Sequence, residues 1–307
     1  MAVNLLEVAK RQKDLYKRGV IEVYANATEL MQVLPFEDIE GMAVKYNQES
    51  MLPGIGFRGI NEAYTESTGV INPVMDPLVI AGGDVDIDRF LLRTGGEGQR
   101  EGQEAMKIKS LAHKWSDTFI KGDNTTDPRV FDGLQVRLGG SQLIANGATS
   151  GGDPLSLAKL DELIDAVDSP THLIMNKTLA RRLTAAARST SVGGFVTWEK
   201  DEFGRRIMFY NDLPVVRMGA NGEIYNTLDF VEAGSGGGST ASSVYCVSMG
   251  PGMLTGIQNS EIDVEDLGQL QTQPVERTRI EWYAGIAMYH PRAAARLSSV
   301  SNAAIVA

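Results

Sequence analysis

The chain has little of the side-chain chemistry that enzymes and metal proteins use. Its single cysteine, Cys246, excludes a disulfide framework and a cysteine-based zinc site, and it fits a reducing compartment. The histidines His113, His172 and His290 are widely separated and lack metal-ligand spacing. Cys246 lies within VYCVSMG, a pattern that favours a small buried strand residue over a reactive thiolate. We therefore expect structural roles for all four side chains.

Catalytic motifs are also missing. The sequence has no G-x-S-x-G, no G-x-x-x-x-G-K-[ST] and no H-E-x-x-H, and the glycines in residues 96–102 have the wrong spacing for a dinucleotide turn. Three aspartates in residues 84–88 resemble the start of a calcium loop, but Arg89 replaces the loop glycine and Gly95 the closing carboxylate. The sequence predicts a protein that is not an enzyme, with no catalytic residue, cofactor or metal site.

Positive charge is scarce. Lysine and arginine number 29 against 39 acidic residues, which gives a net charge of -10. Dedicated nucleic-acid binders neutralise phosphates with clustered basic residues. Because such residues are scarce here, we expect any DNA to be enclosed by the protein without being tightly bound to it. No stretch reaches the roughly 20 apolar residues that a membrane span needs, and charges run through the first 19 residues. The sequence therefore predicts a soluble protein without a signal peptide.

A long amphipathic helix is the clearest element that the sequence does contain. Ile108, Leu111, Trp115 and Phe119 recur every three or four residues and form one apolar stripe. We predict a helix over residues 96–121 that packs this stripe on a sheet. Its first turns contain glycines instead, so we expect that end to be free to bend.

Residues 35–75 have the pattern of two extended stretches joined by a glycine-rich tip. A lone hairpin is marginal in water, so its apolar side chains need a surface from elsewhere, and another subunit is one source. The candidate intersubunit contacts are Tyr46, Met51, Phe57, Arg58 and Tyr64. Residues 3–18 predict a short helix with a basic face, either solvated or docked on a neighbour.

The remaining sequence mixes strands and helices and predicts an α/β or α+β domain. We expect helices at residues 154–167 and 177–189, and strands at residues 84–91, 171–176, 207–210, 213–218, 243–249 and 275–290. The strand at 275–290 is expected to pair with that at 84–92, so that the middle of the chain is inserted into a platform. Residues 234–239, GSGGGS, predict a flexible loop, either a hinge or an exposed tip.

The order of these features resembles the major capsid proteins of tailed bacteriophages, which have the HK97-type fold. Four phrases are similar to that family: FIKGD followed by FDGL at residues 119–134, HLIMNKTLARRL at 172–183, NDLPVV at 211–216, and GIAMYHPRAAARL at 285–297. The resemblance implies an α+β fold with an N-terminal arm, an extended β-hairpin loop, a peripheral domain on a long spine helix, and an inserted axial domain.

Mapped onto this chain, the resemblance implies five parts. These are the arm at 1–34, the extended loop at 35–75, the peripheral domain at 76–129 with its spine helix at 96–121, the axial domain at 130–270, and a return to the peripheral domain at 271–307. Gly236, Gly237 and Gly238 would belong to an axial loop.

The same resemblance implies a function. The protein would be a head shell subunit that forms hexamers and pentamers and then an icosahedral shell around double-stranded DNA, with later expansion of the head. It would be found in the virion after assembly in the host cytoplasm. Its partners would be copies of itself, a separate scaffolding protein and a portal, with or without a decoration protein. The alternative is the shell of an encapsulin-type nanocompartment.

Overall fold

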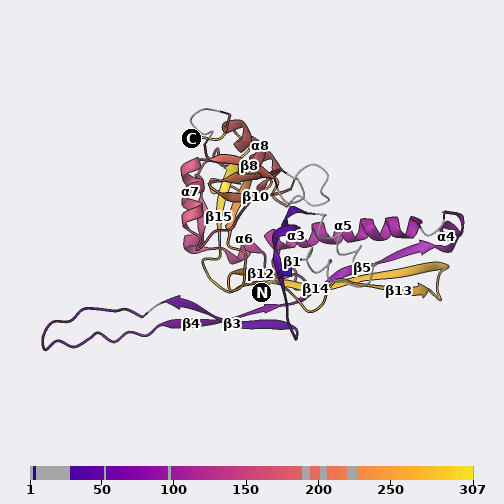
Figure 1. The fold of residues 1–307 in the computed structure, drawn as a ribbon, viewed down its shortest axis with the longest axis horizontal. Coiled ribbons are helices and arrows are strands. Elements are labelled where there is room, and N and C mark those ends of the chain that lie inside the picture. The colour runs from indigo at the N-terminus through magenta and orange to yellow at the C-terminus, as the bar shows by residue number, and fades with distance from the viewer. Residues whose placement is uncertain are drawn as a thin grey trace.

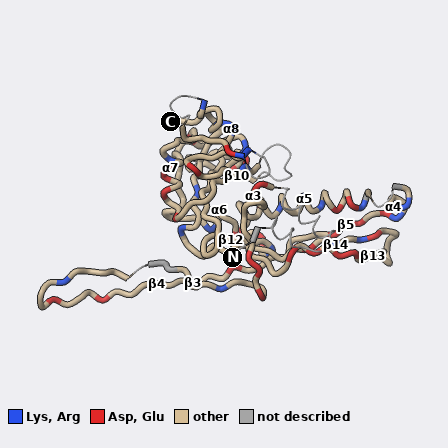
Figure 2. Tube along the Cα trace, viewed as in Figure 1, with Lys and Arg blue, Asp and Glu red and all other residues tan. Residues whose placement is uncertain are grey.

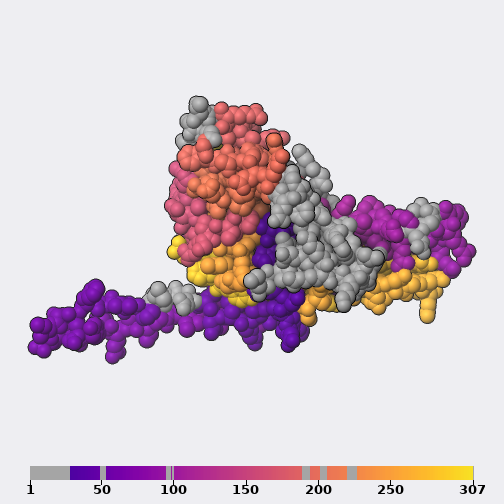
Figure 3. Space-filling model, viewed as in Figure 1, coloured from indigo at the N-terminus to yellow at the C-terminus, as the bar shows by residue number. Residues whose placement is uncertain are grey.

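The computed structural model describes residues 3–4, 28–51, 53–95, 98–188, 194–200, 206–219 and 227–306. Three parts are visible in Figure 1: a body of strands and helices, an arm formed by one long helix beside long strands, and a thin hairpin that projects in the opposite direction. The space-filling view shows how far the hairpin reaches beyond the body (Figure 3).

The first sheet has six strands and forms the arm and the floor of the body. They are β1 (Val3–Asn4), β2 (Pro35–Asp38), β5 (Val79–Asp88), β12 (Leu254–Gln258), β13 (Asp263–Gln269) and β14 (Val275–Met288). The longest, β14, runs antiparallel to β5, β12 and β13. The predicted pairing of the last long strand with the strand in residues 84–92 is therefore confirmed, with Val275 opposite Asp88 and Ala284 opposite Val79.

The second sheet has seven strands and lies in the body. In spatial order they are β6 (Leu143–Ala145), β15 (Ala294–Ser301), β11 (Ala241–Val247), β7 (His172–Asn176), β10 (Leu213–Met218), β9 (Arg206–Tyr210) and β8 (Val196–Lys200). Strand β11, between β15 and β7, is buried along its whole length, Ser242 and Ser243 included. A strand with no exposed residue is found where both faces of a sheet are covered.

The helices divide between the two sheets. They are α3 (Glu29–Val33), α4 (Arg89–Gly95), α5 (Gly98–Lys121), α6 (Leu134–Arg137), α7 (Leu157–Asp165) and α8 (Lys177–Ala186), with a 3-10 turn at Gly140–Gln142. Helices α7 and α8 pack on one face of the second sheet and enclose one core. The other face joins α3, α5 and β14 in a second core. Asn176 begins α8 by accepting a hydrogen bond from the backbone N–H of Thr178 at 2.6 Å.

The third sheet is the projecting hairpin itself, β3 (Ala43–Met51) and β4 (Val70–Pro77). Residues 53–69 join these strands. Neither strand belongs to the larger sheets, so the hairpin leaves the body as a separate two-stranded ribbon (Figure 1).

Two expected boundaries near the N-terminus are wrong. The expected N-terminal arm does not extend to residue 34, because Leu30, Met31 and Leu34 are fully buried in the core. The extended loop does not begin at residue 35, because β2 pairs in parallel with β12 in the first sheet. Val3–Asn4 is a strand rather than the start of a helix, and residues 5–27 lie outside the described residues.

The expected boundary at residue 270 is wrong in both directions. Strands β12 and β13, assigned to the axial domain, pair with β14 in the first sheet. Strand β15, assigned to the peripheral domain, pairs with β11 in the second sheet. After β11 the chain therefore crosses to the first sheet and then returns to the second. The sheet to which each strand belongs is decided by pairing between segments that are distant in the sequence. The strand expected over residues 84–91 ends at Asp88, whose carboxylate accepts the Phe90 N–H at 2.7 Å and starts α4.

Candidate interaction surface

The tip of the hairpin carries large apolar side chains that bury nothing in this chain. Ile55 and Ile60 are each 95% exposed, Phe57 is fully exposed, and Tyr64 is 67% exposed. Apolar side chains that gather on one projecting segment in this way mark an interaction site rather than ordinary surface. Phe57 and Tyr64 are two of the predicted intersubunit residues.

The tip is also held by hydrogen bonds of its own. The Glu62 carboxylate accepts the Gly59 N–H at 2.8 Å, and the Ser67 hydroxyl accepts the Gly54 N–H at 2.7 Å. The guanidinium of Arg58 lies 5.1 Å from the centre of the Tyr64 ring, a cation-π contact. The tip that the glycines predict to be flexible therefore has a defined shape, which presents its apolar side chains outward.

The base of the hairpin is fixed to the body by a buried charge. Asp76 on β4 is 3% exposed and pairs with the Arg137 guanidinium of α6 at 2.8 Å. The Tyr46 hydroxyl lies 2.7 Å from Asp76 Oδ2 and 2.8 Å from the Met288 carbonyl oxygen. Burial raises the pKa of Tyr46, and the hydrogen bond to Asp76 raises it further.

This network gives one predicted contact a role within the chain. The Tyr46 hydroxyl binds Asp76 and Met288 of its own chain, and its contact with another subunit stays a prediction. Tyr46 and Met288 are 242 residues apart in the sequence. The local strand pattern around Tyr46 therefore gives no sign of this hydrogen bond. Met51 ends β3, and its side chain lies outside the described residues.

The arm formed by α5, β5, β13 and β14 is lined with ion pairs, which Figure 2 shows as alternating positive and negative residues. Arg277 on β14 contacts Asp86 at 2.6 Å, and Arg279 contacts Asp84 at 2.9 Å. These hydrogen-bonded guanidinium groups hold the pKa values of both aspartates below the usual range. The alternation of acidic and apolar residues predicted that one face of β5 is exposed to solvent. On that face the aspartates pair with arginines of the neighbouring strand β14.

The beginning of α5 is not free. Arg100 binds Glu104 at 3.0 Å and Asp266 of β13 at 2.8 Å, and the Thr278 hydroxyl donates to the Glu104 carboxylate at 2.7 Å. These contacts fasten the glycine-containing end of the helix to the sheet, contrary to the expectation of a free end. The glycines themselves pack on nothing, because a Cβ at Gly98 or Gly102 would meet no atom within 4 Å.

The other end of α5 lies in an aromatic cluster. Trp115 is 5.7 Å from Trp282 of β14 and 5.6 Å from both Phe36 of β2 and Phe119, measured between ring centres. The predicted stripe residues Ile108, Trp115 and Phe119 are buried here, and Leu111 is partly buried against the same cluster. The C-terminal half of α5 is therefore held in the core of the body, and its first turns are held by the contacts of Arg100 and Glu104.

The glycine loop at residues 234–239 is exposed but not loose. Gly237 accepts a hydrogen bond from the Gly151 N–H at 2.7 Å, and the Ser235 N–H donates to the Ser299 hydroxyl at 2.8 Å. A Cβ at Gly236 would stand 2.0 Å from the Ala148 carbonyl oxygen. Gly236 and Gly238 are therefore needed for close backbone contact, and Gly237 and Gly238 have positive φ angles. The expectation of a flexible loop is wrong, because the backbone is bonded on both sides.

The side chains with catalytic potential are sequestered. Burial lowers the pKa of His172 to about 4 and raises that of Cys246 to about 12, so neither titrates near neutrality. Among the described residues no group of His, Cys, Asp and Glu is arranged to hold a metal ion, and no helix is long and apolar enough to span a membrane.

One buried polar group escaped sequence analysis altogether. Arg296 on β15 donates to Glu232 at 2.9 Å and to the Ser243 hydroxyl at 3.0 Å, inside the second sheet. Ser243 lies in a strand pattern and Arg296 in a run of alanines, so no local signal brings them together.

Comparisons with known proteins give similarity of structure alone. No protein-family model matches the sequence, and no curated protein sequence matches it. A holo-SrpI encapsulin complex from Synechococcus elongatus PCC 7942 is similar, with 15% identity, 91% of this chain and 89% of that chain covered, and a TM-score of 0.65. The capsid of a native GTA particle has 15% identity, 90% and 91% coverage and a TM-score of 0.61. Mycobacterium phage Bobi has 12% identity, 89% and 90% coverage and a TM-score of 0.60.

These likenesses run along nearly the whole chain and confirm the expected fold class. The protein has the α+β HK97-type fold that phage capsids and encapsulins share.

Proposed function

We propose that this chain is the subunit of a closed protein shell and that it assembles with copies of itself into hexamers and pentamers. The observation that carries the proposal is the hairpin tip, whose Ile55, Phe57 and Ile60 are at least 95% exposed on a body with a shell-protein fold. A second copy would cover these side chains and remove their contact with water. Phe57, Arg58 and Tyr64 are the proposed intersubunit contacts.

The shell is proposed to be a head that encloses double-stranded DNA. The net charge of -10 supports this, because a wall without excess positive charge lets packaged DNA move. The resulting particle would be a virion, assembled in the host cytoplasm with a separate scaffolding protein and a portal, with or without a decoration protein. Expansion of the head would require α5 and the strands beside it to rotate or bend without unfolding.

An encapsulin-type compartment is the second candidate. It has the same fold, since the TM-score is 0.65 to an encapsulin and 0.61 and 0.60 to the GTA capsid and the phage protein. Both candidates place the same hairpin between subunits and differ in what the shell contains.

The contents of purified particles separate the two candidates. Particles are treated with nuclease, opened, and tested for nucleic acid and for co-purifying proteins. Protected double-stranded DNA of uniform length supports the head. An enzyme held inside without protected DNA supports the compartment. Particles that do not form at all would contradict both.

A further inference from the structure

A groove of about 490 Å³ lies in the body, where α8 faces the edge strand β8. In Figure 1 these two elements lie at the end of the body away from the hairpin. The floor of the groove is apolar and includes Ala180 of α8 and Met208 of β9, both buried. Charged, polar and aromatic side chains surround this floor: Glu29, Lys177, Arg181, Thr184, Trp198 and Arg217.

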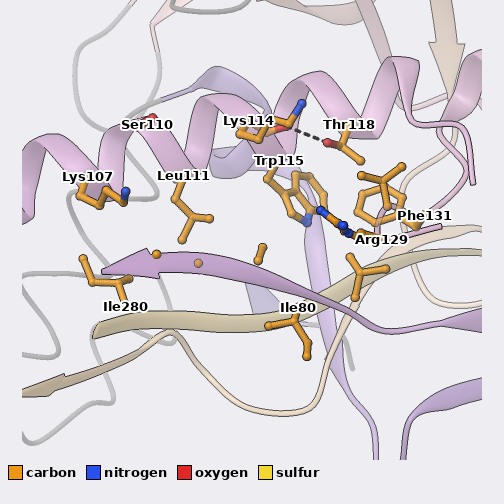
Figure 4. A pocket seen from close by; sticks show the side chains of 15 residues that line it. Ile80, Lys107, Ser110, Leu111, Lys114, Trp115, Thr118, Arg129, Phe131 and Ile280 are labelled. Carbon is orange, nitrogen blue, oxygen red and sulfur yellow. Dashed lines mark hydrogen bonds between the residues drawn. The ribbon is translucent and has the colours of Figure 1, made fainter. Parts of the chain in front are cut away.

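Trp198 presents an open aromatic face to this groove. It is 44% exposed, although Met208, its partner across the β8–β9 ladder, is 1% exposed. The other two tryptophans are enclosed: Trp115 is 2% exposed between α5 and β5 (Figure 4), and Trp282 is 0% exposed. Within the described part of the chain, no aromatic ring and no cation stacks on Trp198. An open indole beside an apolar floor is a platform for a planar ring.

The wall that α8 forms is positively charged. This helix carries Lys177, Arg181 and Arg182 and no acidic residue. Lys177 and Arg181 are four residues apart, so they share the face of α8 that lines the groove. The Arg181 guanidinium is exposed and has no hydrogen bond or ion pair with any described residue. A guanidinium in this state is suited to bind two oxygens of a phosphate group.

The one carboxylate among the described lining residues is already occupied. Glu29 Oε2 accepts the Arg217 backbone N–H at 2.8 Å, and Glu29 Oε1 accepts the Arg217 guanidinium at 2.7 Å. This pair closes one end of the groove and leaves no unpaired carboxylate there. The groove therefore favours an anion, although the protein as a whole is acidic.

Thr184 adds a hydrogen-bond acceptor between the cation and the ring. Its hydroxyl donates to the Ala180 carbonyl oxygen at 3.0 Å, so lone pairs of its oxygen are left to accept a hydrogen bond. An acceptor beside an aromatic wall matches an exocyclic amine of a nucleobase, because bases bind by stacking and by hydrogen bonds at their edges.

We propose that this groove binds a nucleoside phosphate, with its base stacked on Trp198 and its phosphates at Arg181. The ligand is either a free nucleotide or an unpaired nucleotide of a single strand, since both supply the same ring and phosphate. This site goes beyond the proposed shell function and does not depend on it.

The first test uses the purified full chain, in whatever assembly state it adopts, without divalent cations. ATP, adenosine and inorganic triphosphate are added separately. Because Trp198 is the exposed tryptophan, ATP should quench the tryptophan emission to a saturating level. In competition with a ribose-labelled fluorescent ATP, adenosine and triphosphate should each bind about tenfold more weakly than ATP, or weaker still. No quenching by ATP, or triphosphate that binds as tightly as ATP, would overturn the proposal.

Four variants locate the binding, measured by the anisotropy of the labelled ATP. Trp198→Leu and Arg181→Gln should each weaken binding by about tenfold or more, and Trp198→Phe, which keeps a ring, should recover part of the loss. The matched control is Arg182→Gln, which makes the same charge change on α8. Arg182 lies 3.3 Å from Asn302 Oδ1 and does not line the groove, so this control should bind like the wild type. Equal losses from Arg181→Gln and Arg182→Gln would show unspecific attraction to a positive surface and contradict the proposal.

Two further arms identify the source of the ligand and test for a neighbouring copy. Tighter binding of a single-stranded hexa-adenylate than of ATP would identify a strand as the source, and the reverse would identify a free nucleotide; either supports the proposal. The tip variant Ile55→Ser, Phe57→Ser is then compared with assembled wild-type particles. Binding by the tip variant alone would mean that a neighbouring copy fills the groove, and would overturn the proposal.

Discussion

Replacing two apolar side chains at the hairpin tip should abolish assembly without affecting the fold. The double variant Ile55→Ser, Phe57→Ser changes side chains that are 95% and fully exposed in the single chain. Surface substitutions of this kind usually change the free energy of unfolding by no more than about 0.5 kcal/mol. The isolated subunit should therefore unfold at the same urea concentration as the wild type.

The effect on assembly follows from the area that a neighbour would cover. Full burial of an Ile or Phe side chain contributes about 1.5–3 kcal/mol, so the two together contribute about 3–6 kcal/mol to each contact. With about 1.4 kcal/mol for each factor of ten, each contact weakens by about 10² to 10⁴. Every subunit of a ring makes this contact, so closed particles should be lost.

Size-exclusion chromatography with light scattering measures the outcome. The matched control is Met42→Ser, which removes a side chain that is 82% exposed near the base of the hairpin rather than at its tip. The control should assemble like the wild type while the tip variant stays as small species. Assembly of the tip variant at wild-type concentration would refute the idea that the tip is an intersubunit contact.

Three further predictions concern stability. Asp76→Ala leaves the Arg137 guanidinium buried without its carboxylate, which should cost about 3–5 kcal/mol by urea denaturation and should speed hydrogen exchange in residues 43–77; unchanged exchange there would contradict the anchoring role. Gly236→Ala should lower the free energy of unfolding by about 1–3 kcal/mol, because the added Cβ would stand 2.0 Å from a carbonyl oxygen. Gly102→Ala lies inside α5 and faces open space, so it should raise the free energy of unfolding by about 1 kcal/mol. Equal effects of the two variants would contradict this account of the glycines. Burial lowers the pKa of His172 from 6.5 to about 4, so on acidification the unfolded state binds the proton before the folded state does. The contribution of His172 to the free energy of unfolding should be complete above pH 6.5 and should fall by up to about 3 kcal/mol as the pH drops to about 4. His172→Asn should remove this part of the dependence of stability on pH, and an unchanged dependence would show that other groups cause it.

Elements with a strong local pattern could be predicted from the sequence. The stripe through Trp115 and Phe119 gives the long helix, and the alternation in residues 275–288 gives β14. Asp84 and Asp86 predicted a solvent-exposed face of the strand. Their arginine partners, Arg277 and Arg279, lie on the same face of the sheet. These signals are local because helix and strand periods are properties of consecutive residues.

The misplaced elements depend on contacts between distant residues. Strand β2 is short, and nothing within Pro35–Asp38 tells that it pairs with β12, more than 200 residues later. The same holds for β15, whose small residues pair with β11 rather than with β14. The loop at Gly236 resembles a flexible linker in composition, but its glycines serve close packing on Ala148. Composition alone cannot distinguish these two uses of glycine.

The central claim is that this chain closes into a shell. Electron microscopy of the purified full-length protein tests it most directly. The account predicts uniform hollow particles with closed symmetry. A small monodisperse monomer under every assembly condition, with the hairpin tip left in solvent, would contradict it.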